Sequence, residues 1–312
     1  MPEKAFHKAL RHLHETALGT LWRQWAALGA LTAGGKHARG IVDPEGLVLL
    51  SLSLAEEEHR LWDLLNWWAR VGATLISVQR IRNLAGRYPD QVRGRLGEFA
   101  HLAHHEGGDF RWRPLERPVS KRVIRLGKNL GRQPQLLVSP ALMLRLRLGL
   151  GVGIKADLLA FLLGTGGTRV SVRTIADALA YTPRAVHRAV DDMAGARLIQ
   201  AIEGTPKLYH VDPKPWIELL GTSRGAPPTW CEWPPVFAFV AALGEWAEGQ
   251  NLLKASPYVL SSQARDLMER HRIAFTRNQI SIPYPDDYSG EAYIQGFEKT
   301  LTTLASWMEE NA

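Results

Sequence analysis

The sequence of residues 171–194 is SVRTIADALAYTPRAVHRAVDDMA, and its apolar residues have the spacing of two short helices joined by a tight turn. Each half carries one apolar stripe, formed by Ile175, Ala176 and Leu179 in the first half and by Val186, Ala189, Val190 and Met193 in the second. Thr182 and Pro183 favour a helix start between the halves, because the hydroxyl caps unpaired N–H groups and proline has the φ angle of a first helical position. We therefore predict two amphipathic helices that each bury one face.

The residues on either side extend this helix pair into a larger unit. Before the pair we predict an apolar helix at 158–163 and a short strand at 169–172. After the pair we predict two strands, at 197–203 and 207–211, joined by a turn. This order of helix, strand, helix, helix and hairpin over residues 154–212 resembles the winged helix-turn-helix of bacterial transcription regulators. The resemblance implies a bacterial DNA-binding protein, and it leaves the DNA site and the regulating signal open.

A second, weaker copy of the same pattern lies 94 residues upstream. The aligned pairs include Gly72 with Gly166, Ser77-Val78 with Ser171-Val172, and Pro89 with Pro183, and no gap is needed between them. Any two amphipathic helix pairs can be aligned in part, but matched serine, glycine and proline positions favour a true repeat. Asp43 and Pro44 provide a cap and a first helical position for a helix that we expect to run to about Leu54.

The composition is typical of a globular chain with more than one domain. It has 312 residues, of which 46% are hydrophobic and 22% are charged, and one hydrophobic core usually serves fewer residues. Cys231 is the single cysteine, which excludes an internal disulfide and suits a reducing compartment. The N-terminal sequence lacks a signal-peptide pattern, and no stretch has the length of a membrane span. We therefore expect a cytoplasmic protein that does not bind membranes.

Positive charge is concentrated in the middle of the chain. The formal net charge is +7, and residues 111–147 contain ten lysines and arginines but a single acid, Glu116. This distribution indicates contact with a polyanion, and a solvated basic linker is the alternative.

The predicted fold is mainly α-helical with small β wings. We expect tandem winged helix-turn-helix domains at 41–113 and 139–213, a basic connector at 114–138, an N-terminal helical arm at 1–40 and a C-terminal α+β unit at 214–312. The apolar face of the arm should pack on the body of the protein or on a second copy of the chain in a homodimer. In the C-terminal unit we predict helices at 236–247, 261–271 and 291–310 and a hairpin at 272–283.

In a helix-turn-helix, the second helix enters the major groove and its N-terminal residues contact base edges. In the second domain this assigns base contacts to Arg184 and Arg188, with His187 on the same face, because an arginine fork binds both acceptors of guanine. Arg173 and Thr174 are expected at a phosphate. Lys207, beside the predicted wing, is expected at the flanking DNA backbone or minor groove. Residues 171–194 nevertheless carry no net charge, because they contain three arginines and three aspartates.

The first domain has the stronger positive charge and the weaker match to the pattern. Its expected DNA contacts are Arg80, Arg82, Arg93 and Arg95, then Arg111 and Arg113 in a wing at 110–113, and Arg122, Arg125 and Lys128 in the connector. Gly94 and Gly97 interrupt its expected recognition helix, and each costs about 1 kcal/mol of helix stability. We expect this domain to hold the DNA backbone and the second domain to recognise the base sequence.

No catalytic signature is present, and we predict neither enzymatic activity nor a cofactor. His101, His104 and His105, with Glu106, have the spacing of one helical face, which is compatible with a metal ion. However, a helix C-terminus also favours histidine and no cysteine is near, so no metal is assigned.

The predicted function is sequence-specific binding of double-stranded DNA as a transcription regulator. A plasmid-type replication initiator, to which tandem winged helices are also similar, is one alternative. A winged-helix scaffold or antitoxin-like protein that binds another protein is the other. The sequence does not indicate whether a small molecule acts as an effector.

Overall fold

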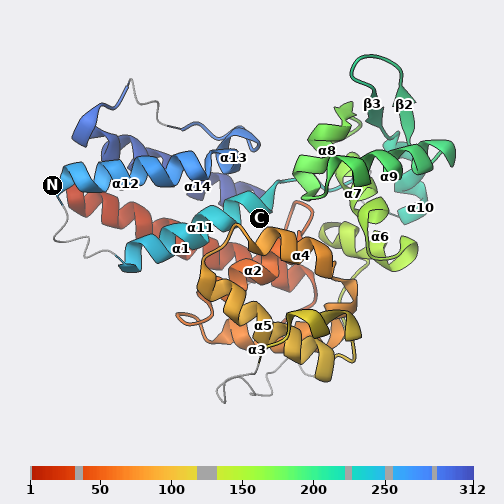
Figure 1. Ribbon diagram of the computed structural model, residues 1–312, viewed down its shortest axis with the longest axis horizontal. Coiled ribbons are helices and arrows are strands. Elements are labelled where there is room, and N and C mark those ends of the chain that lie inside the picture. The colour runs from red at the N-terminus through yellow and green to blue at the C-terminus, as the bar shows by residue number, and fades with distance from the viewer. Residues whose placement is uncertain (1, 32–37, 118–131, 222–226, 250–255, 283–286) are drawn as a thin grey trace.

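The computed structural model describes residues 2–31, 38–117, 132–221, 227–249, 256–282 and 287–312. In these residues the chain is mainly α-helical, and its strands form one three-stranded antiparallel sheet (Figure 1), as the sequence predicts in outline. The buried apolar side chains among them form two hydrophobic cores, one larger than the other. No described helix is both long and apolar enough to cross a membrane.

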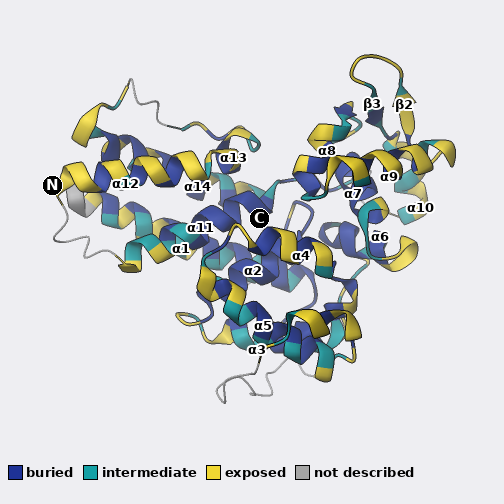
Figure 2. Ribbon diagram, in the orientation of Figure 1, coloured by how far each residue is buried: buried dark blue, intermediate teal, exposed yellow. Residues whose placement is uncertain are grey.

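The larger core is built by helices from both ends of the chain. They are α1 (Pro2–Ala27), α2 (Pro44–Leu54), α3 (Arg60–Val71), α4 (Val78–Ala85), α5 (Asp90–His105), α11 (Trp233–Gly249), α12 (Pro257–Arg270), α13 (Arg272–Thr276) and α14 (Tyr293–Asn311). Helix α2 lies at the centre of this group, and all of its residues except Ser53 are buried (Figure 2). Asp43 caps α2 and Pro44 begins it, so the predicted helix start is confirmed.

The predicted N-terminal arm packs on the body of the protein, which is the first of the two options considered. Helix α1 lies along α14 and also contacts α2 and α11. Phe6 is 1% exposed, and its ring centroid lies 6.0 Å from those of Trp246 in α11 and Phe297 in α14. The arm, the first predicted domain and the C-terminal unit therefore share one core, because each contributes an apolar face that the others cover.

The C-terminal unit contains no strand in its described residues, so the prediction of an α+β unit is wrong there. The expected hairpin at 272–283 begins instead with the short helix α13. Consecutive residues Ala274 and Phe275 are both fully buried, and the Phe275 ring centroid lies 4.9 Å from that of Phe239 in α11. An alternating strand would have turned one of these two side chains toward solvent.

The smaller core contains the elements predicted between residues 154 and 212, in the predicted order. They are α7 (Ile154–Gly164), β1 (Val170–Ser171), α8 (Val172–Leu179), α9 (Pro183–Gly195), β2 (Gln200–Ile202) and β3 (Leu208–His210), with α6 (Leu142–Leu150) before them and α10 (Pro213–Leu220) after them. Strand β3 is central in the sheet, where Tyr209 pairs with Val170 of β1 and with Ala201 of β2.

The helix order expected of the repeat occurs in both segments, whereas in the described residues strands accompany it in the second segment alone. Helices α3, α4 and α5 follow the order of α7, α8 and α9, and Ser77 and Ser171 cap the equivalent helices α4 and α8. The wing expected at 110–113 is instead a 3₁₀ helix (Phe110–Leu115), and the described part of 41–113 has no strand. Trp112 is fully buried with its ring centroid 5.2 Å from that of Phe99. The first wing was therefore wrongly predicted, because burial of this indole holds the segment against α5.

Candidate nucleic-acid interface

The turn between α8 and α9 is anchored on both sides. Pro183 begins α9, and the Thr182 hydroxyl accepts the N–H of Ala185 at 3.3 Å, as the sequence predicts. The Tyr181 hydroxyl donates a hydrogen bond to the Asp157 carboxylate on α7 at 2.8 Å. The direction in which α9 leaves the turn is therefore set by the core of its own unit.

Helix α9 buries one face and exposes the other. Its apolar stripe is at most 3% exposed and consists of Val186, Ala189, Val190 and Met193. Arg184, His187 and Arg188 are exposed on α9, and Arg173 and Thr174 are exposed at the start of α8. The structure thus places these five predicted contact residues on the exposed surface of one helix pair.

The acidic side chains of this helix pair are each bound by a base. The pairs are Asp177 with Arg277 (3.4 Å), Asp192 with Lys155 (2.7 Å) and Asp191 with His187 (2.8 Å). Arg277 follows α13 in the larger core and Lys155 belongs to α7, so two of the three partners come from outside residues 171–194. The third pair is ionic only when His187 is protonated.

Within the described part of the chain, the exposed arginines of the same region have no such partners. Among the described residues, no carboxylate lies within 4.0 Å of the guanidinium groups of Arg169, Arg173, Arg184, Arg188 and Arg197, all of which are exposed. Although residues 171–194 are neutral in sequence, their surface therefore presents unneutralised positive charge. Arg169 and Arg197 lie outside the two helices and were not among the predicted contacts. The sequence places them directly before β1 and just after α9, and this closeness to the helix pair is the signal by which they could have been predicted.

Lys207 differs from these arginines. It lies at the turn between β2 and β3, where its ammonium group pairs with Glu203 at 2.7 Å. The hydrogen bond to Glu203 raises the pKa of Lys207, and the carboxylate compensates its charge. The predicted wing contact of Lys207 therefore has a competing partner within the protein.

Arg80 is buried between the two cores, so its predicted contact with DNA is wrong. Its side chain is 0% exposed. The guanidinium donates to the carboxylates of Asp43 and Glu45 at 2.5–2.9 Å, and its Nε donates to the carbonyl of Leu179 at the end of α8, at 2.9 Å. Burial opposes the charge of Arg80, but the two carboxylates outweigh burial and raise its pKa.

Arg147 of α6 completes the same buried network from the other side. It binds the Glu45 carboxylate and the Asp157 carboxylate, each at 2.6 Å. Burial favours the neutral form of Glu45, but Arg147 and Arg80 together lower its pKa, so it remains charged. The network joins α2 and α4 of the larger core to α6, α7 and the end of α8, and it fixes the α8–α9 pair relative to the larger core.

Two further predicted contacts of the first domain are occupied by partners within the protein. Arg95 donates to two carbonyls at the end of α2, at 2.9 and 3.0 Å. Arg111 pairs with Asp109 at 2.6 Å and donates to the carbonyl of Thr74 at 2.8 Å. These guanidinium groups have lost part of their donor capacity to helix ends and to a neighbouring acid.

The other predicted contacts of this part of the chain divide into two sets. Arg82, Arg93 and Arg113 are exposed, and Arg93 pairs with Asp90 one turn away on α5. Arg122, Arg125 and Lys128 lie outside the described residues.

Arg117 lies against the outward face of α5 at Gly97. At the repeat spacing of 94 residues, Gly94 and Gly97 of α5 correspond to Arg188 and Asp191 of α9. The N–H of Arg117 donates to the carbonyl of Gly97 at 3.0 Å, and a Cβ added at Gly97 would lie 2.5 Å from Cγ of Arg117. Gly97 is thus required for the close approach of Arg117, and the position that is open at Asp191 of α9 is closed at Gly97 of α5.

Comparison of the chain with known protein families, with curated proteins and with solved structures finds no match.

Proposed function

We propose that the unit formed by α7 to β3 is a winged helix-turn-helix that binds double-stranded DNA in a sequence-specific manner, as a transcription regulator does. Helix α9 would lie in the major groove, where Arg184 and Arg188 would contact guanine edges. Arg173 and the exposed start of α8 would lie at a phosphate.

The observation that carries this proposal is the division of charges on the α8–α9 surface. Its acids have base partners, two of them from outside residues 171–194, whereas its exposed arginines have none among the described residues. Unpaired arginine forks on one helix pair favour an anionic ligand, because phosphate and guanine both offer the paired acceptors that a guanidinium binds.

The element order and the anchoring of the turn also support the proposal. The chain order α7–β1–α8–α9–β2–β3 agrees with the helix, strand, helix, helix and hairpin of the winged helix-turn-helix that the sequence resembles. The hydrogen bonds of Arg80 with Leu179 and of Tyr181 with Asp157 hold the turn before α9. A groove-binding helix must be held firmly, since base contacts require a defined geometry.

The test is selection of bound duplexes from a random pool, followed by affinity measurements on the selected duplex by fluorescence anisotropy. We expect the double variant Arg184→Ala/Arg188→Ala to bind at least tenfold more weakly, since each bidentate contact contributes about 1–3 kcal/mol. Arg270→Ala is the matched control, because Arg270 is an exposed arginine on α12, a helix that packs in the larger core. Its affinity should equal that of the unmodified chain.

Salt dependence distinguishes DNA binding from binding of another protein. Several phosphate contacts predict a steep loss of affinity between about 50 and 200 mM salt. Failure to enrich any duplex, or equal affinities for the double variant and Arg270→Ala, would overturn the proposal and favour a scaffold.

A further inference from the structure

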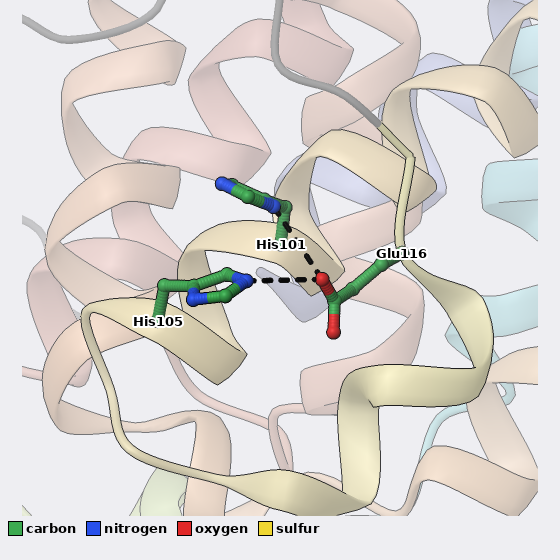
Figure 3. Close-up of side chains that lie close together, drawn as sticks. All are labelled: His101, His105 and Glu116. Atoms are coloured by element: carbon green, nitrogen blue, oxygen red, sulfur yellow. Dashed lines mark hydrogen bonds and ion pairs between the residues drawn. The ribbon is translucent and has the colours of Figure 1, made fainter.

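Three histidines on the last turn of α5 converge on one carboxylate that the sequence pattern did not associate with them. Oε2 of Glu116 lies 3.1 Å from Nε2 of His105 and 3.5 Å from Nδ1 of His101 (Figure 3). The other carboxylate oxygen, Oε1, contacts Nδ1 of His104. Glu106, which directly follows these histidines in the sequence, is instead paired with Arg70 at 3.3 Å.

The three imidazoles lie close together. The ring centroids of His101 and His105 are 4.2 Å apart, and those of His104 and His105 are 4.4 Å apart. Two ring nitrogens and one carboxylate oxygen, from two separate segments of the chain, thus face a common point at which a cation could be bound.

We propose that His101, His105 and Glu116 bind a divalent transition-metal ion of the Zn²⁺ type, and that His104 holds the carboxylate in position. The three ligand atoms all lie within 4.8 Å of one another. Ligands about 2.1 Å from a tetrahedral ion lie about 3.4 Å apart, so the two measured separations from Glu116 Oε2 already suit such an ion. Two imidazoles and one carboxylate favour Zn²⁺, Co²⁺ or Ni²⁺ over Mg²⁺ or Ca²⁺, which prefer oxygen ligands.

The two histidine ligands are more exposed than His104, the positioning residue. The side chains of His101 and His105 are 36% and 52% exposed, so an ion can enter from solvent and keep a water ligand. The His104 side chain is only 14% exposed, and its ring packs edge-on to Phe110 with a centroid distance of 5.1 Å. His104 is thus held in place, as a residue that orients a metal ligand must be.

The ion would add a second connection between α5 and the segment that contains Glu116, which a backbone hydrogen bond already holds together. Glu116 directly precedes Arg117, whose N–H binds the carbonyl of Gly97 on α5. Bound metal would therefore fasten Glu116 and Arg117 against α5. This inference concerns α5 alone and does not depend on DNA binding by α9.

The test is titration of the full-length, untagged, metal-free chain with Zn²⁺ by calorimetry, and with Co²⁺ by visible absorption. We expect one ion per chain and a higher Tm with Zn²⁺ present, since a ligand that binds the folded state stabilises it. His104→Ala should weaken binding about tenfold, the lower end for loss of a positioning partner. His105→Ala and Glu116→Gln should weaken binding more than His104→Ala does.

His59→Ala is the matched control, because His59 is an exposed histidine next to α3. It should bind Zn²⁺ as the unmodified chain does. Absence of Zn²⁺ binding to the unmodified chain, or unchanged affinity in His105→Ala and Glu116→Gln, would overturn the proposal. Glu116→Gln preserves side-chain shape, so it serves as the decisive variant if His105→Ala does not fold. No DNA is present, so the result is independent of the proposed function.

Discussion

The helix pairs α4–α5 and α8–α9 rank differently by charge in the sequence and on the folded surface. Residues 77–95 carry five arginines and one aspartate, whereas residues 171–194 carry three of each. In the structure, Arg80 is buried and Arg95 binds the end of α2, while the acids of the second pair are bound by bases. The pair that is richer in arginine therefore offers less free positive charge. Counting charges along a segment does not measure the charge of a surface, because the partners of each charge come from elsewhere in the chain.

The largest expected effect concerns the buried network that makes Arg80 unavailable. Arg80→Met should lower the free energy of unfolding by about 3–5 kcal/mol, because it leaves buried carboxylates without their partner. Arg82→Met is the control on the same helix, since Arg82 is exposed, and surface changes stay within about 0.5 kcal/mol. Urea unfolding at pH 7 measures both. Equal stabilities for the two variants would show that Arg80 is not the structural residue described here.

The next effect compares the outward faces of α9 and α5 directly. On the selected duplex, Arg188→Glu should lose about 2 kcal/mol of binding free energy or more, because it removes a base contact and adds a repulsive charge. Arg93→Glu on α5 should change the affinity less than threefold, about 0.6 kcal/mol, since Arg93 is already paired with Asp90 and Arg117 lies against α5 one turn further on, at Gly97. Anisotropy at one fixed salt concentration compares them. A loss at Arg93 as large as that at Arg188 would mean that both helix pairs hold DNA.

The two glycines of α5 test whether its outward face is closed. At Gly94 a Cβ has no neighbour closer than 3.8 Å, so Gly94→Ala should stabilise the protein by up to about 1 kcal/mol through helix propensity. Gly97→Ala should destabilise it by about 1 kcal/mol or more, because Arg117 must move. Thermal unfolding of both variants measures the difference. Stabilisation by both substitutions would indicate that the segment at Arg117 does not lie against α5.

The smallest effect is the pH dependence of a stability difference. This is the difference in free energy of unfolding between the unmodified chain and Arg80→Met. In the unmodified chain the arginines lower the pKa of Glu45. Its stabilising charge is therefore present above the free value of about 4.3 and is lost only as the pH falls through the lower folded value. In Arg80→Met, burial of Glu45 with one cation fewer should raise this pKa, so protonation relieves the buried charge earlier. We expect this difference in free energy of unfolding to become smaller by about 1 kcal/mol between pH 7 and pH 4. Urea unfolding at the two pH values measures it, and an unchanged difference would show that Glu45 does not become protonated earlier in Arg80→Met.

Local patterns were sufficient for the elements between residues 154 and 212. The apolar stripes of α8 and α9, the cap at Thr182 and the proline at Pro183 all act within a few residues. The same holds for α2, which begins at the predicted cap, Asp43. The failures occurred where a long-range contact prevailed over a local pattern. Trp112 is buried against Phe99 where a wing was expected, and Phe275 packs on Phe239 where a hairpin was expected.

The candidate sites divide in the same way. Exposure of Arg184 and Arg188 follows from the helical period of α9, and the histidine spacing on α5 is visible in the sequence. The partner of those histidines was not visible, because Glu116 returns to α5 only after a 3₁₀ helix that the pattern did not predict. Glu106, the nearer acid in sequence, was the natural expectation and proved to be bound elsewhere.

The amino-acid sequence alone therefore established the helices, their caps and the buried face of each, since these depend on neighbours within one or two turns. Folding in three dimensions selected the partners of the charges. Arg80 meets Asp43 across 37 residues and Arg147 meets Glu45 across 102. Nothing in a local pattern distinguishes these arginines from exposed ones, because Coulomb attraction and desolvation depend on distance and burial in space and not on separation along the chain.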